Sequence, residues 1–272
     1  MHQPIVNIAL NAARAAGRVI EQALVRADQL TIEAKGQNDF VTAVDRAAEA
    51  AVIDVIQKTF PKHDILGEEG GRIAGKGGGS DTEWIIDPLD GTTNFIHGFP
   101  QFAVSIGIQV NGRMEHAVVF DPLRKEEFTA SRGRGAQLNG RRIRVSDRKT
   151  LEGALIGTGF PFRKEQMPHI DAYLAMFKDL ASQTAGIRRP GSAALDLAYV
   201  AAGRMDGFWE FGLKPWDMAA GCLLITEAGG LVSDFNGGET HMEKGHIVGG
   251  NPKVLKALLK SIAPHVPENW KR

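Results

Sequence analysis

The sequence is poor in cysteine and has no excess of charge of either sign. Its 272 residues include one cysteine, Cys222, in an apolar stretch. This excludes an internal disulfide framework and predicts a buried, unreactive thiol in a cytoplasmic protein. Lysine plus arginine and aspartate plus glutamate both total 32, so overall charge attracts neither nucleic acid nor membranes. Any such partner would have to use a local patch.

The first residues lack the long apolar run of a signal peptide or a membrane span. Charged residues interrupt residues 1–26, where the spacing of apolar residues predicts an amphipathic helix. The histidines lack the spacing of a metalloprotease zinc site, and neither a G-x-x-x-x-G-K-S/T loop nor a G-x-S-x-G elbow occurs. Nucleotide hydrolysis by a P-loop and acyl transfer by a serine nucleophile are therefore not leading hypotheses.

A short predicted strand in residues 84–95 is followed directly by carboxylates and a helix start. Pro88 is expected to end the strand, because proline lacks the N–H that a ladder needs, and this leaves Asp87 at the carboxyl end. Asp90 and Gly91 follow, and Gly91 allows the backbone to approach an anion that free N–H groups of the helix start attract. Hard carboxylate oxygens beside such a cradle suggest Mg²⁺ holding a phosphate.

Two further acidic junctions support this interpretation. Glu68 and Glu69 follow the apolar pair Ile65 and Leu66, and Asp217 lies at a second strand-to-helix transition. Each junction alone is ordinary turn or helix-cap chemistry, but one metal site would explain all three. Mg²⁺ prefers oxygen ligands, so carboxylates and a substrate phosphate would complete its shell better than nitrogen or sulfur.

The remaining pattern predicts an α/β or α+β protein. A helix follows Asp45, which we expect to cap it, and residues 72–82 predict a glycine-rich loop that could cover the site. Residues 102–144 have the short β runs and tight turns of an antiparallel meander. After residue 150, apolar strands alternate with helices expected around residues 169–181, 193–202, 216–228 and 252–260. We therefore expect halves at 1–150 and 151–272 that form one intimate unit.

Several long motifs resemble the signatures of the inositol monophosphatase family. They are Gly67-Glu68-Glu69, the run from Asp87 to Asn94, and Trp216-Asp217-Met218-Ala219-Ala220-Gly221. The resemblance covers nearly the whole chain, and residues 191–198 and 204–208 are most similar to the bacterial SuhB branch. It implies the αβαβα sandwich of the inositol monophosphatase and fructose-1,6-bisphosphatase type. The half 1–150 would carry most metal ligands, and the half 151–272 would complete the site.

The resemblance also implies a magnesium-dependent phosphatase with two or three ions. One ion would bind Glu68, Asp87 and the backbone carbonyl of Leu89. A second would bind Asp87, Asp90 and Asp217, so that Asp87 bridges the two. Paired metals stabilise the attacking and leaving oxygens of an in-line displacement and activate water.

The matching positions imply the catalytic groups as well. Glu68 and Thr92 would orient or deprotonate the attacking water, and Asp45 would support Thr92. Lys35 would act as an electrostatic helper near the metals. The substrate would be a small phosphorylated polyol such as an inositol monophosphate. Its contacts would come from Asp90, Gly91, Thr92, Gly191, Ser192, Ala193, Glu210 and Asp217.

Other functions remain open at this point. The same machinery could act on fructose 1,6-bisphosphate, a 3′-phosphonucleotide or NADP, because specificity lies in loops rather than in metal ligands. The SuhB branch also resembles factors that join RNA polymerase and NusA in ribosomal RNA antitermination. Basic surfaces for such a role, or for direct RNA contact, could come from Arg188-Arg189 or from Arg141, Arg142 and Arg144. The family resemblance further implies a homodimer.

Overall fold

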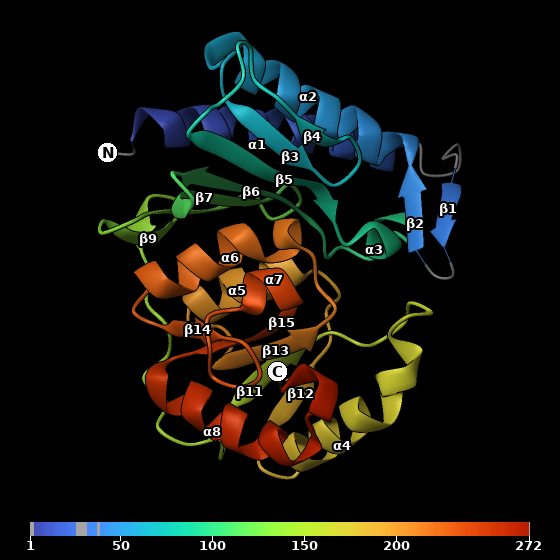
Figure 1. The fold of residues 1–272 in the computed structure, drawn as a ribbon, viewed down its shortest axis with the longest axis vertical. Helices are drawn as coiled ribbons and strands as arrows, with labels where there is room; N and C mark the ends of the chain where they lie inside the picture. Colours follow the sequence, from blue (N-terminus) through green and yellow to red (C-terminus); the bar gives the residue numbers. More distant parts are fainter. Residues whose placement is uncertain (1–2, 26–31, 37–38, 272) are drawn as a thin grey trace.

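Layers of helices and sheets alternate along the long axis of the molecule. The computed structural model describes residues 3–25, 32–36 and 39–271, but not the side chains of residues 32–36 and 39–41. Helices α1 (Pro4–Leu24) and α2 (Ala43–Thr59) form one outer layer, and α4 (Ile170–Ala181) and α8 (Pro252–Ile262) form the other. Helices α5 (Ala193–Ala201) and α6 (Pro215–Glu227) lie between two large sheets (Figure 1). The αβαβα sandwich that the sequence predicts is confirmed.

The larger sheet contains the predicted antiparallel meander. Its strand order is β10-β9-β8-β7-β6-β5-β3-β4, and β3 and β5 are parallel while the other neighbours are antiparallel. The strands are β3 (Asp64–Gly67), β4 (Gly71–Ile73), β5 (Thr82–Asp90), β6 (Ala103–Val110), β7 (Arg113–Asp121), β8 (Glu126–Ser131), β9 (Gly135–Leu138) and β10 (Arg141–Arg142). A separate antiparallel pair, β1 (Ile32–Gly36) and β2 (Asp39–Thr42), leads into α2.

The smaller sheet belongs to the second half of the chain. Its order is β12-β11-β13-β15-β14, with β11 parallel to both β12 and β13. The strands are β11 (Leu155–Thr158), β12 (Gly186–Arg188), β13 (Gly207–Phe211), β14 (Leu231–Ser233) and β15 (His246–Gly250). The short helix α3 (Thr92–Ile96) lies in the chain between β5 and β6, and α7 (His241–Lys244) lies between β14 and β15. Because β11, β12 and β13 are parallel, their carboxyl ends lie at the same edge of the sheet, where ligands commonly bind.

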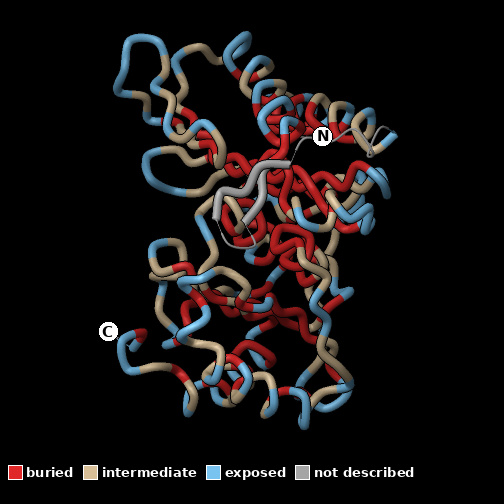
Figure 2. Tube along the Cα trace, turned by 90° about the vertical axis from the view of Figure 1, so that its right-hand side faces the viewer, coloured by how far each residue is buried: buried red, intermediate tan, exposed pale blue. Residues whose placement is uncertain are grey.

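Both faces of the larger sheet are covered, so its strands alternate between two cores. On β7, Ala117 and Val119 belong to the core with α5 and α6, whereas Val118 and Phe120 belong to the core with α1 and α2. Helix α6 is buried along residues 218–225, as expected for a helix between two sheets. Figure 2 shows the buried residues concentrated where the layers meet, with exposed residues along the outer loops. Among the described residues, no helix combines the length and apolar character needed to span a bilayer.

Three local predictions were wrong in position. Strand β5 continues through Pro88 to Asp90, and its register with β6 becomes irregular between Asp87 and Asp90. At such an irregularity a proline need not donate to the ladder, so it does not end the strand. Helix α2 begins before Asp45. Its N-cap is Thr42, and Asp45 completes a capping box from the third helical position, where its Oδ2 accepts from the Thr42 N–H at 2.7 Å. The loop predicted over residues 72–82 is also shorter at its start, because residues 72 and 73 belong to β4.

A half-buried histidine near the C-terminus makes stability depend on pH. The ring centroids of His246 and Trp270 lie 4.3 Å apart. Burial lowers the pKa of His246 from its usual 6.5 to about 4. Between these values the unfolded chain binds a proton that the folded chain does not, so acid favours unfolding. We expect His246→Phe to flatten the loss of stability between pH 6.5 and pH 4, measured by urea unfolding of both proteins. An unchanged pH slope would contradict this assignment.

Candidate active site and metal centre

Carboxylates from both halves of the chain converge at one end of the parallel strands. Asp87 and Asp90 lie on the last part of β5, and Asp217 lies in the first turn of α6. One carboxylate oxygen from each of these side chains lies within 4.8 Å of the others. Asp87 and Asp90 are buried and Asp217 is partly exposed. All the donors are hard oxygens, which fits Mg²⁺ better than a softer metal.

The negative charge of this cluster favours binding of a cation. Burial, and then repulsion from Glu68, Asp90 and Asp217, raises the pKa of Asp87 well above its usual range. Burial and the charge of Asp90 raise the pKa of Asp217 to about 7. A metal ion would relieve both the repulsion and part of the desolvation, because it supplies the opposite charge at the point where the carboxylates meet.

A hydrogen-bond chain connects α2 to the start of α3. Asp45 is buried, and its Oδ1 accepts from the Thr92 hydroxyl at 2.9 Å while Oδ2 accepts from Thr42. The Thr92 hydroxyl also lies 3.1 Å from the carbonyl oxygen of Leu89. Gly91 has a φ of +96°, and a Cβ there would lie 2.9 Å from the carbonyl oxygen of Gln101, so only glycine fits this turn. These contacts hold Thr92 at the edge of the pocket.

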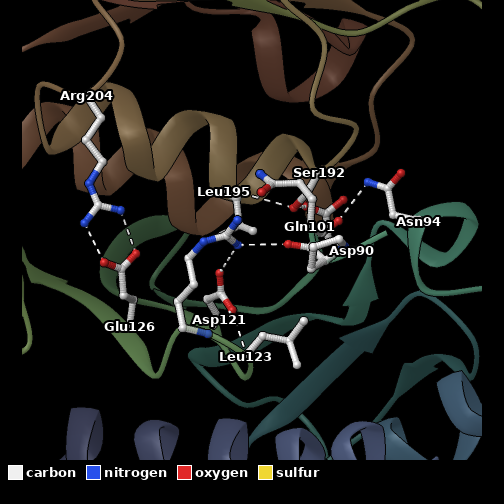
Figure 3. Close-up of polar contacts among 11 residues, drawn as sticks. Asp90, Asn94, Gln101, Asp121, Leu123, Glu126, Ser192, Leu195 and Arg204 are labelled. Atoms are coloured by element: carbon white, nitrogen blue, oxygen red, sulfur yellow. Dashed lines mark hydrogen bonds and ion pairs between the residues drawn. The ribbon is translucent and has the colours of Figure 1, made fainter. Parts of the chain in front are cut away.

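Side chains of the first half hold residues 190–194 of the second half. The Ser192 hydroxyl and the Ala194 N–H donate to Asp90 Oδ2 at 2.5 and 2.8 Å. The Asn94 amide lies within hydrogen-bonding distance of the carbonyl oxygens of Pro190 (2.9 Å) and Gly191 (3.1 Å). Figure 3 shows Asp90, Ser192 and Asn94 together at one end of the boundary between the halves. At the other end, Arg204 pairs with Glu126.

A pocket brings together nearly all of the residues that the sequence suggested. Its lining includes Glu68, Asp87, Leu89, Asp90, Gly91, Thr92, Gly191, Ser192, Ala193, Glu210 and Asp217. Asp45 lies behind Thr92 rather than in the lining. Lys35 belongs to β1, but its side chain is outside the described part of the structure. The functional roles of these residues stay predictions.

Comparison with known proteins decides the family. The sequence matches the inositol monophosphatase family over residues 1–270. The chain belongs to this family. The protein named Nus factor SuhB from Pseudomonas aeruginosa is 63% identical to it over 270 residues, which are 99% of this chain and 100% of that protein.

Solved structures of the inositol monophosphatase family have the same fold. The extragenic suppressor protein suhB from Bartonella henselae superposes with a TM-score of 0.93 at 42% identity, over 97% of this chain and 100% of that one. The inositol monophosphatase from Anabaena has a TM-score of 0.84 at 40% identity, over 97% of each chain. The protein is therefore a phosphatase, and its acidic cluster is suited to the metal dependence of the family.

The family motifs did not reveal one side of the pocket. Apart from Thr93 and Asn94, which belong to the Asp87–Asn94 motif, the other lining residues are Gly159, Phe162, Arg163, Gln166, Arg189, Gly212 and Leu213. Three of these residues directly follow parallel strands: Gly159 follows β11, Arg189 follows β12 and Gly212 follows β13. Ligands commonly bind at the carboxyl ends of parallel strands, so recognising these strands in the sequence could have indicated this side.

Glu210 shows how closely this side is packed. A Cβ on Gly159 would lie 1.8 Å from Glu210 Oε1, so the carboxylate occupies space that only glycine leaves. Burial, followed by the charges of Asp217 and Asp90, raises the pKa of Glu210 to about 8, while Arg189 opposes this shift. Glu210 therefore responds to charge from both halves of the protein.

Sequence reasoning also missed Glu49, which supports one predicted ligand. This buried side chain on α2 accepts from the N–H of Glu69 at 3.0 Å and of Gly70 at 2.7 Å. A Cβ on Gly67 would lie 2.4 Å from Glu49 Oε2, so the turn packs tightly around this carboxylate. Glu49 thus fixes the turn that carries Glu68. It gave no signal in the sequence, because it lies on a helix far from the motif.

Proposed function

We propose that this phosphatase hydrolyses inositol monophosphates with two or three Mg²⁺ ions. The convergence of Asp87, Asp90 and Asp217 within 4.8 Å carries the proposal. Glu68 and the Leu89 carbonyl would complete the ligand set, with Asp87 shared between two ions. Bound Mg²⁺ supplies Lewis-acid stabilisation of phosphate charge and lowers the pKa of water at the site.

The chain itself would position the reactants. Asp45 holds the Thr92 hydroxyl, which would orient a water molecule for in-line attack on phosphorus. Glu68 would accept the proton from that water, and Lys35 would add positive charge nearby. The backbone N–H groups of Gly91 and Thr92 would bind phosphate oxygens. Attack and loss of the alcohol would occur in one displacement without a phosphoenzyme.

Residues of the second half, together with Asp90 of the first, would recognise the polyol. Glu210 and Asp90 would accept hydrogen bonds from sugar-like hydroxyls, which penalises analogues that lack them. Gly191, Ser192 and Ala193 would line the same side, where Ser192 already donates to Asp90. Fructose 1,6-bisphosphate, a 3′-phosphonucleotide and NADP remain alternative substrates, to be compared with inositol 1-phosphate in one Mg²⁺-containing screen.

Ion dependence provides the direct test of this proposal. We expect inositol 1-phosphate hydrolysis to need Mg²⁺, to stop in excess chelator and to be inhibited by Li⁺. Li⁺ is close to Mg²⁺ in size but has half the charge, so it would fill a ligand position without stabilising the leaving oxygen. Inhibition should weaken as Mg²⁺ rises if the two ions share a site. Activity that ignores Li⁺ at concentrations comparable with Mg²⁺ would contradict the shared site.

The name Nus factor SuhB of the Pseudomonas relative supports a second candidate function. In this proposal the protein is a cytoplasmic homodimer that also joins RNA polymerase and NusA, with or without RNA contact. Arg188 lies exposed on β12, an edge strand of the smaller sheet. Arg189 lines the catalytic pocket, so it does not separate the two functions and only Arg188 is a suitable probe.

A pair of variants distinguishes regulator from enzyme. Asp217→Asn is expected to abolish phosphate release and leave binding to purified NusA or polymerase unchanged, because a protein interface is far larger than the metal site. Arg188→Glu is expected to weaken that binding in a salt-dependent way and to leave turnover within about twofold of the parent. Titrations at micromolar protein and low salt measure both. Absence of binding by the parent, or equal binding by Arg188→Glu, would end this second proposal.

A further inference from the structure

The segment between β11 and α4 forms part of the pocket without regular secondary structure. Residues 159–166 follow the last residue of β11, and a short 3₁₀ helix, Met167–His169, comes before α4. Phe162 and Arg163 of this segment line the pocket. Irregular backbone has no ladder to fix it, so the position of this part of the wall depends on individual hydrogen bonds.

Gln166 makes those bonds from a buried side chain that is 7% exposed. Its Oε1 accepts from the backbone N–H groups of Phe162 and Arg163, both at 3.1 Å. Its Nε2 donates to the carbonyl oxygen of Phe211 at 3.3 Å, and its own N–H donates to the carbonyl oxygen of Arg163 at 3.0 Å. One amide therefore joins the irregular segment to β13.

Strand β13, which Gln166 contacts at Phe211, also carries Glu210. The glycine that follows this strand, Gly212, leaves room for the Gln166 amide. Gly212 has a φ of +77°, and a Cβ there would lie 2.5 Å from Gln166 Nε2. A side chain at Gly212 would thus displace Gln166. The glycine and the amide together set the distance between the Phe162–Arg163 wall and the strand of Glu210.

We call the Gln166 side chain with its hydrogen bonds to Phe162, Arg163 and Phe211 the clamp. The residues that this clamp holds lie on the polyol side of the pocket. The Arg163 guanidinium carbon lies 5.5 Å from the centre of the Phe162 ring. Its charge opposes the rise in the pKa of Glu210 and of Asp217. Within the described part of the chain, Thr92 and Asp90 are held by Asp45, Ser192 and Ala194, whereas Gln166 bonds to Phe162, Arg163 and Phe211.

We propose that Gln166 is a positioning residue that fixes the Phe162–Arg163 wall and thereby determines affinity for the substrate's alcohol portion, with little effect on the chemical step. The predicted changes in KM and kcat rest on the proposed inositol phosphatase function. The clamp itself has a consequence that does not depend on catalysis, because its loss should release the backbone around Arg163 and Lys164.

The test compares Gln166→Met, Gln166→Glu and the control Gln183→Met with the parent. Methionine keeps the length of Gln166 but makes none of its amide bonds, whereas glutamate keeps the acceptor for the Phe162 and Arg163 N–H groups. Gln183 is exposed and donates to the Asp179 carbonyl oxygen and to Ser261 on the surface. The variants are assayed with inositol 1-phosphate and Mg²⁺, with inorganic phosphate as inhibitor, and by limited trypsin digestion.

For Gln166→Met we expect KM to rise about tenfold or more while kcat stays within about threefold of the parent. Inhibition by inorganic phosphate, which lacks the alcohol portion, should be unchanged. Trypsin should cut faster after Arg163 and Lys164. Gln166→Glu should fall between parent and Gln166→Met, and it carries the test if the methionine variant does not fold. Gln183→Met should match the parent in every measurement.

Two outcomes overturn the inference. One is an unchanged KM in the Gln166 variants, and the other is a kcat that falls as steeply as KM rises. A parent that does not hydrolyse inositol 1-phosphate would refute the proposed function instead. In that case equal trypsin cleavage of parent and Gln166→Met would still overturn the clamp, and faster cleavage confined to residues 163–164 would support it.

Discussion

Asp90→Asn is expected to lower kcat by about a hundredfold or more while the protein stays folded. The substitution removes a negative charge from the metal cluster and weakens its hold on a cation. An amide oxygen can still accept from the Ser192 hydroxyl and the Ala194 N–H, so the contact between the halves should survive. The measurement is phosphate release at saturating substrate and Mg²⁺, with circular dichroism as the check on folding.

Asp121→Asn is the matched control for loss of a buried carboxylate. Asp121 is 1% exposed, accepts from the N–H groups of Leu123 and Arg124, and does not line the pocket. Its replacement should cost stability, because it breaks a paired buried carboxylate, but should leave kcat near that of the parent. Turnover of Asp90→Asn within tenfold of the parent would remove Asp90 from the proposed metal ligands.

Asp87→Asn is expected to make the metal-free protein more heat-stable than the parent. Burial and repulsion raise the pKa of Asp87, so its ionised form opposes folding above the usual pKa of a carboxyl group. Asparagine removes the charge and can still accept from the Leu89 N–H through its Oδ1, a bond of 3.0 Å in the parent. Each kcal/mol gained should raise the melting temperature by about 2–4 °C.

Melting temperatures measured in chelator and in Mg²⁺ separate the loss of charge repulsion from a general effect of the substitution on stability. With Mg²⁺ the order should reverse, because the parent gains more from binding the ion. Asp54→Asn on the exposed face of α2 is the control, because Asp54 pairs with Lys58 at the surface and its replacement should change neither melting temperature appreciably. A lower melting temperature of metal-free Asp87→Asn would show that Asp87 supports the fold rather than a metal.

Much of the secondary structure could be predicted because its signals are local. The meander on β6 to β9 follows from short alternating runs separated by tight turns, and the helices of the second half follow from apolar spacing. The errors at Pro88 and Asp45 have the opposite cause. Whether a proline ends a strand depends on the neighbouring strand's register, and whether an acid caps a helix depends on where Thr42 directs the chain.

The sequence by itself determined the carboxylate inventory of the site. Asp87, Asp90 and Asp217 stand within contiguous motifs at strand and helix ends, so their chemistry could be read without knowing which segments meet. Only the tertiary structure decided what surrounds them. Gln166, Arg189 and Glu49 reach the site or its supports through strand alignment and helix packing between segments far apart in the chain. Such contacts depend on the arrangement of layers, which no local pattern of residues records.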